Sequence, residues 1–183
     1  MKKKYILTVT LNPALDCFVL RGKKEIYSAG GKGINVSRGL KRLGVETVAT
    51  GFWGGKIGLR IKKYLHQERI NHDFVETSAE TRINLTMAGD FGRHQRVIEE
   101  GHKVQKKFID LFFKKYRQLL KKSRGVVICG RNANGLSDKI YSDLIQTARW
   151  KNIPVFLDTS SAALKRAIKA KPFLIKVNEE EMK

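Results

Sequence analysis

The sequence predicts an α/β protein whose mainly parallel central sheet is covered by helices on both faces. The first observation behind this prediction is that short apolar, β-branched segments alternate with segments of helical periodicity along most of the chain. Such alternation is typical of right-handed βαβ units, which build parallel sheets. The second observation is a different texture between His72 and Glu100, where turn residues separate short strand-like runs. These residues predict a small β-meander beside the main layer.

The strands of the main layer are predicted from near-continuous apolar letters, which are characteristic of strands buried on both faces. They are KYILTV at Lys4–Val9, TVAT at Thr47–Thr50, GVVIC at Gly125–Cys129, PVFLD at Pro154–Asp158 and FLIKV at Phe173–Val177. The helices are predicted at Gly31–Leu43, Lys56–Glu68, Lys103–Lys121, Asp138–Trp150 and Ser161–Ala170. The meander is predicted to use His72–Glu76, Arg82–Met87 and Arg96–Glu99, with a hairpin turn at Gly89-Asp90.

Length and composition fit one domain. The chain has 183 residues, of which 42% are hydrophobic, enough for a sizeable core. No apolar run approaches the length of a membrane span, and the apolar stretch after the basic N-terminus is short and lacks a small-residue cleavage site. Cys17 and Cys129 stand far apart without a histidine cluster, which favours neither a disulfide scaffold nor a zinc site. A cytoplasmic protein without a membrane partner is expected.

The chain is strongly basic, with 37 Lys+Arg against 17 Asp+Glu and a formal net charge of +20. A charge of this size attracts polyanions, either nucleic acid in a weak, sequence-independent manner or small phosphorylated ligands. Many of the cations fall in Lys103–Arg124, where apolar residues at helical spacing leave the charges on the opposite side. The simplest interpretation of that segment is a solvated helix face. The charge therefore indicates an anionic partner without naming it.

In open α/β sheets, ligands bind beyond the carboxyl ends of the strands. This rule selects Asn12–Asp16, Gly30–Asn35, Gly130–Gly135, Asp158–Ser161 and Asn178–Glu181 as candidate site segments. The second segment begins with Gly-Gly-Lys-Gly, which matches neither the G-x-x-x-x-G-K-[ST] nor the G-x-G-x-x-G phosphate-binding pattern. By itself it predicts only a tight turn before a helix.

Several motifs in a fixed order give the chain a much more specific resemblance. They are TLNPALD (Thr10–Asp16), AGGKGINVSRGLKRLG (Ala29–Gly44), ATGFWGG (Ala49–Gly55), ETRIN (Glu80–Asn84), VFLDTSSAAL (Val155–Leu164) and KPFLIKVNEEE (Lys171–Glu181). Together they resemble the phosphofructokinase B-type (PfkB) sugar kinases of the ribokinase-like fold, especially the branch of 1-phosphofructokinases and tagatose-6-phosphate kinases. The resemblance implies a three-layer α/β/α sandwich formed by residues 1–183 as a single domain, with a small β lid from about 17–28 and 72–100 and with the C-terminal part of the fold missing.

The resemblance also implies a sugar site. In the family the sugar lies against the backbone of the double glycine, which here is Gly30 and Gly31. Asp16 would accept hydrogen bonds from sugar hydroxyls, Asn35 would use its side-chain amide on them, and Arg82 would hold the phosphate already on the sugar. Without the resemblance, Asp16 is simply a turn residue, Asn35 a polar residue of a first helical turn, and Arg82 a solvent-facing charge.

A nucleotide site is implied at the C-terminal end of the resemblance. Lys176 and Asn178 match positions near the nucleotide, and Glu181 completes an N-x-x-E pattern that the family associates with organising Mg²⁺ through water. ATP and Mg²⁺ are therefore the implied cofactors. Taken alone, the same acidic residues would indicate the first turn of a helix.

The sequence departs from the family pattern in three ways. It ends at Lys183, so the family's glycine-rich loop and catalytic aspartate lie outside it and no catalytic residue is assigned. Arg131 replaces the small hydroxyl residue of a G-S-L-P-type loop, where it would either capture a phosphate or block the site. The connection from Asp16 to Gly30 is short, which predicts an incomplete lid and leaves a homodimer through the lid open. Lys32 would add positive potential or point to water.

The implied reaction is ATP-dependent phosphorylation of a ketohexose phosphate to a bisphosphate. The ETRIN and GINVSRGLKRLG segments favour fructose 1-phosphate, giving fructose 1,6-bisphosphate, over tagatose 6-phosphate. Because the base and the glycine-rich loop are expected beyond Lys183, the 183 residues by themselves are predicted to lack kinase activity. A non-catalytic sugar-phosphate-binding protein and a basic nucleic-acid-binding protein are the alternatives.

Overall fold

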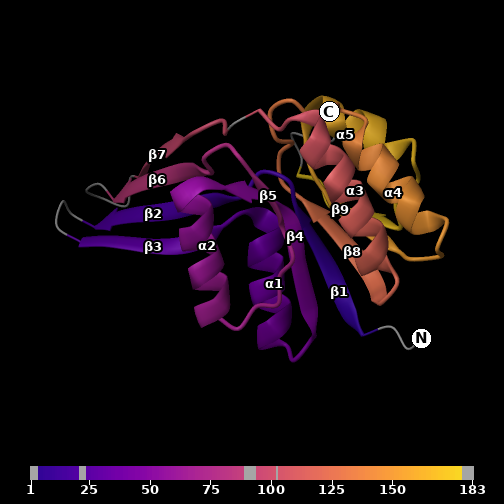
Figure 1. The fold of residues 1–183 in the computed structure, drawn as a ribbon, viewed down its shortest axis with the longest axis horizontal. Helices are drawn as coiled ribbons and strands as arrows, with labels where there is room; N and C mark the ends of the chain where they lie inside the picture. The colour runs from indigo at the N-terminus through magenta and orange to yellow at the C-terminus, as the bar shows by residue number, and fades with distance from the viewer. Residues whose placement is uncertain (1–3, 21–23, 89–93, 102, 179–183) are drawn as a thin grey trace.

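A computed structural model describes residues 4–20, 24–88, 94–101 and 103–178 (Figure 1). The larger of its two sheets consists of β1 (Tyr5–Thr10), β4 (Thr47–Gly54), β5 (Val75–Thr77), β8 (Ser123–Cys129), β9 (Val155–Asp158) and β10 (Leu174–Ile175). The helices are α1 (Lys32–Arg42), α2 (Gly55–Gln67), α3 (Lys106–Leu120), α4 (Ile140–Arg149) and α5 (Ser161–Ile168).

The larger sheet has six strands in the order β10-β9-β8-β1-β4-β5, and its ladders are parallel. The predicted α/β class with a mainly parallel sheet is therefore confirmed. The chain passes from β1 to β4 and β5 on one side, and it later adds β8, β9 and β10 on the other side of β1. The order in which strands are added therefore reverses between the neighbouring strands β1 and β8. In open α/β sheets, ligands bind at the carboxyl ends of the strands beside such a switch point.

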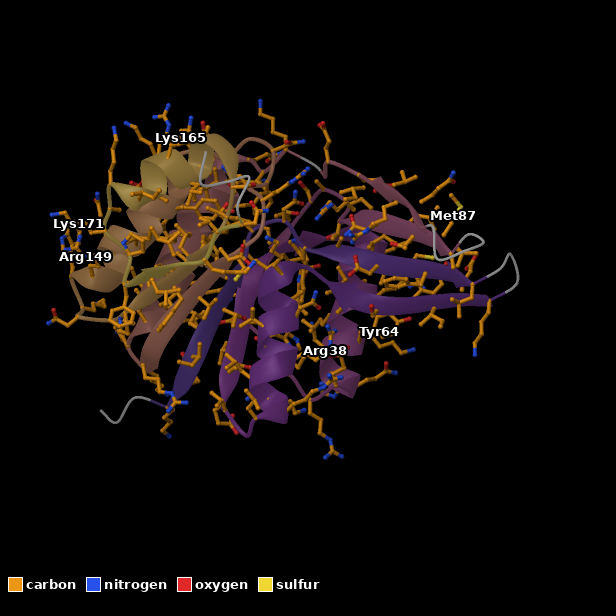
Figure 2. The ribbon with its side chains drawn as sticks, turned by 180° about the vertical axis from the view of Figure 1, so that it is seen from behind. Arg38, Tyr64, Met87, Arg149, Lys165 and Lys171 are labelled. Atoms are coloured by element: carbon orange, nitrogen blue, oxygen red, sulfur yellow. The ribbon has the colours of Figure 1, made fainter. Side chains whose placement is uncertain are left out.

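Helices cover both faces of the larger sheet. In Figure 1, α3 and α4 lie in front of the sheet, and Figure 2, seen from behind, shows α1 on the other face. On the α3 side, Phe112 and Tyr116 are fully buried, and the Phe112 ring lies 4.8 Å from that of Phe52 on β4. The Tyr116 hydroxyl donates to the Leu144 carbonyl of α4 at 3.1 Å, so the one buried phenol of this helix is satisfied.

The second apolar cluster joins α1 and α2 to the edge of the larger sheet and to the strand that follows β1. Ile34 of α1 and Ile61 of α2 are fully buried in it. Trp53 of β4 stacks on Phe74 with ring centroids 4.3 Å apart. This cluster fixes α1, whose first turn reaches the carboxyl edge of the sheet, against its neighbours.

A separate small sheet contains β2 (Ala14–Leu20), β3 (Lys24–Gly30), β6 (Arg82–Ala88) and β7 (His94–Ile98) in the order β3-β2-β6-β7. Figure 1 shows it beside the larger sheet. β2 pairs with β3 and β6 with β7 in antiparallel ladders, whereas β2 and β6 are parallel.

The small sheet contains the strands predicted at Arg82–Met87 and Arg96–Glu99, as β6 and β7, but it differs from the predicted meander in its other strands. The strand predicted at His72–Glu76 appears as β5, which pairs in parallel with β4 in the larger sheet because α2 forms a βαβ crossover between them. β2 and β3 pair in an antiparallel ladder around the Asp16–Gly30 connection, where the family resemblance placed part of the β lid and the local sequence pattern had indicated no strands. The predicted turn at Gly89-Asp90 lies outside the described residues.

The cations of α3 lie on a solvent-exposed helix face, which was the simplest interpretation of this segment in the sequence. Lys106, Lys107, Lys114 and Arg117 are exposed, while the apolar side of the helix is buried. A further group of cations lies at the end of the molecule formed by α4 and α5, where Figure 2 labels Arg149, Lys165 and Lys171. Weak nucleic-acid binding by these surfaces stays a prediction from charge. Within the described ranges, no helix is both long enough and apolar enough to cross a bilayer.

Candidate functional site

A cavity of about 410 Å³ lies where the carboxyl ends of β1 and β8 meet the small sheet. The predicted substrate residues line it, with Gly30 as the one exception. Those lining residues are Asp16, Gly31, Lys32, Asn35, Arg82 and Arg131. They come from the small sheet, from the first turn of α1 and from the loop after β8, so the fold brings together residues far apart in the sequence. Their binding of a sugar phosphate stays a prediction.

Contacts within the protein explain the double glycine. A Cβ atom at Gly30 would overlap the carboxyl group of Asp16, since β3 is paired with β2 here. Gly31 has a φ of 119°, and a Cβ atom there would lie 2.6 Å from Cγ2 of Thr10. Gly31 is also the N-cap of α1, so the free backbone amides of the first turn border the cavity. Close approach of a sugar is therefore not required to account for these glycines.

Asp16 and Asn84 form the floor of the cavity on the small sheet. They are directly paired between β2 and β6, so their side chains leave the sheet on the same face. Nδ2 of Asn84 donates to Oδ1 of Asp16 at 2.8 Å. This contact fixes the orientation of the Asp16 carboxylate, which has further lone pairs for hydroxyl donors.

Arg82 joins the small sheet to two other segments. Its Nη1 donates to Oδ1 of Asn84 at 2.7 Å and to the Glu99 carbonyl at 2.8 Å, while Nη2 donates to the Asn12 carbonyl at 3.1 Å. Its Nε is buried and has no hydrogen-bond partner among the described residues. Most of the guanidinium group thus faces protein acceptors, which the prediction of a phosphate ligand did not anticipate.

Glu80 and Thr81 of the ETRIN motif precede Arg82 and hold the start of β6 in place. The Glu80 carboxylate accepts from the backbone amides of Lys56 at 3.2 Å and Ile57 at 2.7 Å, which caps the first turn of α2. The Thr81 hydroxyl accepts from the amide of Gly54 at 2.8 Å and donates to its carbonyl at 3.1 Å. The motif therefore anchors Arg82 and the strand that follows it.

Asn35 lies on α1 with its side chain exposed to the cavity. Its Oδ1 accepts from Nη1 of Arg38 at 2.5 Å. Arg38, labelled in Figure 2, is itself held by the Glu68 carboxylate at 2.6 and 2.9 Å and by the Ala29 carbonyl at 3.0 Å. Because the carbonyl oxygen of Asn35 must face Arg38, its Nδ2 is left as a hydrogen-bond donor for a ligand.

A carboxylate links the sugar side to the predicted nucleotide side. Oδ1 of Asp158 accepts from Nζ of Lys32 at 3.0 Å, and Oδ2 lies 3.9 Å from Nζ of Lys176. In the part of the chain that the structure describes, no cluster of His, Cys, Asp or Glu is arranged to hold a metal ion. The described residues alone do not fit Mg²⁺, because both oxygens of Asp158 face ammonium groups. Asn178 is exposed beyond β10, and Glu181 lies outside the described residues.

Cys129 lines the cavity at the end of β8. Burial, and to a lesser degree the charge of Asp158, raises the pKa of its thiol to about 12. The thiol therefore stays protonated at neutral pH, and it does not supply a nucleophile to the cavity.

Several polar residues of the cavity were not named individually as site residues from the sequence, among them Asn12, Asn84, Arg96 and Asn134. Nδ2 of Asn12 donates to the Glu100 carbonyl at 3.0 Å, and Nδ2 of Asn134 donates to the Gly101 carbonyl at 2.9 Å. Asn12 and Asn134 both fall in segments that the strand-end rule had selected. Arg96 carried no comparable signal, because its face is set by its pairing with Thr86 across β6 and β7.

A parallel sheet with a small sheet beside its carboxyl edge is the architecture of the ribokinase-like fold, and here a cation-rich cavity lies between the two sheets. The sequence model of the family described as "pfkB family carbohydrate kinase" matches residues 8–183 of this chain. The chain therefore belongs to the PfkB family, as the sequence motifs predicted.

Solved structures of the same class superpose closely. The "Possible 1-phosphofructokinase" of Thermotoga maritima has a TM-score of 0.90 and 31% identity, covering 96% of this chain and 61% of its own. Phosphofructokinase-2 from Escherichia coli in complex with fructose-6-phosphate has a TM-score of 0.85 and 25% identity, covering 98% and 62%. It has also been solved in a tetrameric inhibited form. A putative ribokinase from Agrobacterium tumefaciens, at 16% identity and a TM-score of 0.69, covers 92% and 57% and supports the fold alone.

Proposed function

We propose that this chain carries the sugar-phosphate side of a PfkB-family kinase site and binds a fructose monophosphate. The observation that carries the proposal is the cavity between β1 and β8, which combines the carboxylate of Asp16, the free amide donor of Asn35 and several cations. A carboxylate and an amide suit sugar hydroxyls, and the cations suit a phosphate monoester. The similarity to a 1-phosphofructokinase favours fructose 1-phosphate, with tagatose 6-phosphate as the alternative.

The proposed reaction is the transfer of a phosphoryl group from ATP to the free terminal hydroxyl of the sugar phosphate. Asp16 and Asn35 would orient the sugar, while Lys176, Asn178 and Glu181 would approach the nucleotide and its Mg²⁺. The chain spans about 61% of the length of the Thermotoga maritima relative, and no base is proposed among the described residues. Binding of the sugar is therefore the sharper test than turnover. A sugar-phosphate-binding protein without catalysis would pass the same test, and ADP release would separate the two.

Asp16→Asn is expected to lower the binding affinity for fructose 1-phosphate and for fructose to a similar extent, by about tenfold. The reason is that a charged acceptor for sugar hydroxyls becomes neutral. The variant should fold normally, since the carbonyl oxygen of the new side chain can still accept from Asn84. Isothermal titration calorimetry with both sugars measures the change. Asp110→Asn, at an exposed position of α3, is the matched control and should leave both affinities unchanged. Normal binding by Asp16→Asn would contradict the proposed site.

We also propose that two copies of the chain pair through the open face of the small sheet. By strand register, Phe18 and Leu20 of β2 and Ile26 of β3 leave the sheet on the Asp16 face, and each is more than 40% exposed. These neighbouring apolar side chains form a patch next to the cavity, and such patches mark interaction sites. A second copy would cover the patch and close the cavity mouth.

Phe18→Ser combined with Ile26→Ser is expected to shift the chain from dimer to monomer, because the change removes most of the apolar area that pairing would bury. Sedimentation velocity at several protein concentrations measures the shift. Leu43→Ser removes an apolar side chain that is 78% exposed at the far end of α1, and it should leave the dimer intact. A wild-type chain that is monomeric at all concentrations would contradict the proposed pairing.

A further inference from the structure

Exposed cations line the amino edge of the larger sheet, which is the edge opposite the cavity. They lie in or beside the turns that lead from α3 into β8, from α4 into β9 and from α5 into β10. The sequence places no acidic residue in these turns. Together with the cation that precedes β1, these side chains form what we call the amino-edge row: Lys4, Lys121, Lys122, Arg124, Arg149, Lys151, Lys169 and Lys171.

The row is continuous in space because β10, β9, β8 and β1 are neighbours in the sheet. Adjacent strands lie about 4.8 Å apart, so the row extends over about 15 Å. Two of its turns touch each other: Nη1 of Arg149 donates to the Ala170 carbonyl at 2.8 Å, and Figure 2 shows Arg149 and Lys171 next to each other. The exposed Glu46, in the turn before β4, bounds the row on the far side of β1.

The ends of the helices account for only part of this positive charge. A cation in the last turn of a helix offsets the partial charge of about −0.5 at that end, and α3, α4 and α5 all end at this edge. Lys122, Lys151 and Lys171 lie beyond the helix ends. No cation of the row forms an ion pair with a described acidic residue. The row therefore keeps a positive potential that attracts a polyanion.

Two exposed aromatic side chains stand among these cations. Trp150, which follows Arg149, is 84% exposed, although tryptophan is on average a well-buried residue. Phe173, which follows Lys171 by two positions, is 72% exposed, and an edge contact with the Phe156 ring, 5.4 Å away, holds its orientation. A hollow of about 410 Å³ beside Phe173 is also lined by Arg149 and Lys171. Free ring faces and free cations thus alternate along one end of the row.

We propose that the amino-edge row binds single-stranded nucleic acid, with the cations on its phosphates and with Trp150 and Phe173 stacked on unpaired bases. Sites for single strands combine a positive track with aromatic side chains, because every base offers a ring face. A duplex keeps its bases paired and would use the cations alone. A membrane surface fits less well, because none of the described helices lays an apolar face along this edge. The inference is independent of the proposed sugar site.

The two tryptophans of the chain make the stacking directly measurable. Trp53 is buried and stacked on Phe74, so a base can reach only the exposed Trp150. Titration with oligo(dT) of about 12 nucleotides should quench the tryptophan emission of the wild-type chain. The same titration should leave the emission of Trp150→Phe unchanged, because only the buried Trp53 then emits.

Affinity for fluorescein-labelled oligo(dT), measured by anisotropy, tests the stacking independently. Trp150→Ala and Phe173→Ala are each expected to lower this affinity by about tenfold, the effect of one lost base stack. Trp150→Phe keeps a ring face and should stay within about threefold of the wild type. Leu59→Ala, which removes an exposed apolar side chain from α2, is the matched control and should bind normally. Circular dichroism verifies that each variant is folded.

The salt dependence of the same affinity tests the cations. Each phosphate contact with a single strand contributes about 0.7 to the slope of log affinity against log salt concentration. The double variant Lys122→Gln/Lys151→Gln should therefore reduce this slope by about 1.4. Lys106→Gln/Lys114→Gln removes the same charge from exposed positions of α3 and should leave the slope nearly unchanged.

Four results would overturn the inference. Equal affinity for oligo(dT) and for a duplex of the same length, without quenching, would show attraction by charge alone. Binding to phosphatidylserine-containing vesicles but not to oligo(dT) would assign the row to a membrane surface. Equal slopes in the two double variants would place the strand elsewhere on the protein. Displacement of oligo(dT) by fructose 1-phosphate at constant ionic strength would place the strand in the cavity. Calorimetry with the sugar phosphate tests the proposed function separately.

Discussion

Replacing Phe112 with alanine is expected to lower the free energy of unfolding by about 3–5 kcal/mol. Phe112 is fully buried on α3, with its ring 4.8 Å from that of Phe52 and 6.1 Å from that of Tyr116. Truncation would leave a cavity between α3 and the sheet that neighbouring rings cannot fill without moving the helix. The free energy of unfolding of natural domains is about 5–15 kcal/mol in total, so the variant should lose a large share of its stability. Urea denaturation followed by circular dichroism measures the change.

Leu111→Ala is the matched control for this effect. Leu111 precedes Phe112 on the same helix but is 52% exposed, so truncation should change stability by less than about 0.5 kcal/mol. Both variants place alanine at neighbouring positions of one helix, which leaves burial as the main difference between them. Similar losses for both would contradict the packing described for α3.

Gly30→Ala is expected to reduce the affinity for fructose 1-phosphate and fructose by about tenfold or more, at about the strength of one charge-assisted hydrogen bond. The new methyl group would overlap the Asp16 carboxyl group, which must then rotate away from Asn84 and from the sugar. Because a side chain rather than the backbone gives way, we expect the fold to survive. Calorimetry measures the affinity, and thermal unfolding measures the stability.

Gly39→Ala provides the opposite case within α1. Apart from its chain neighbours and the backbone of its own helix, no atom of the described residues lies within 4 Å of the position that its Cβ would take. Alanine in an exposed helix interior favours folding by about 1 kcal/mol over glycine, so this variant should be slightly more stable and bind both sugars normally. Wild-type affinity in Gly30→Ala would show that the orientation of Asp16 does not matter for the ligand.

The main layer could be predicted because its strands are buried on both faces. In β1, and in Val126–Cys129 of β8, every residue is apolar, aromatic or β-branched, and the pattern does not depend on which element covers which face. The end of β4 was missed because Gly51 and Gly54 suggest breaks in a strand. In the folded chain, Gly51 instead allows the backbone of β4 to approach the Thr10 carbonyl of β1.

The pair of strands β2 and β3 was expected only as part of the lid that the family resemblance implies, because their faces do not alternate in polarity and the local pattern indicates no strands. Phe18 and Leu20 are exposed apolar residues on the same face as Asp16, so the expected period-2 contrast is absent. The candidate site was predictable wherever it follows a strand end or a family motif. The hydrogen bonds of Arg82 and Arg38 join elements that are far apart in the sequence, and no local pattern encodes them.

The contacts of Arg82 have a consequence for the cost of ligand binding. The carbonyls of Asn12 and Glu99 belong to two of the segments through which the chain crosses between the sheets, and Arg82 fastens both to β6. Contacts within the protein thus contribute to the relative placement of the two sheets. A ligand then spends little of its interaction free energy on ordering the walls, which is the usual benefit of preorganisation. Removing the hydrogen bonds of the Arg82 guanidinium would let the two sheets move relative to each other. Ligand binding would then have to order the cavity walls, and this cost would appear as a less favourable binding entropy.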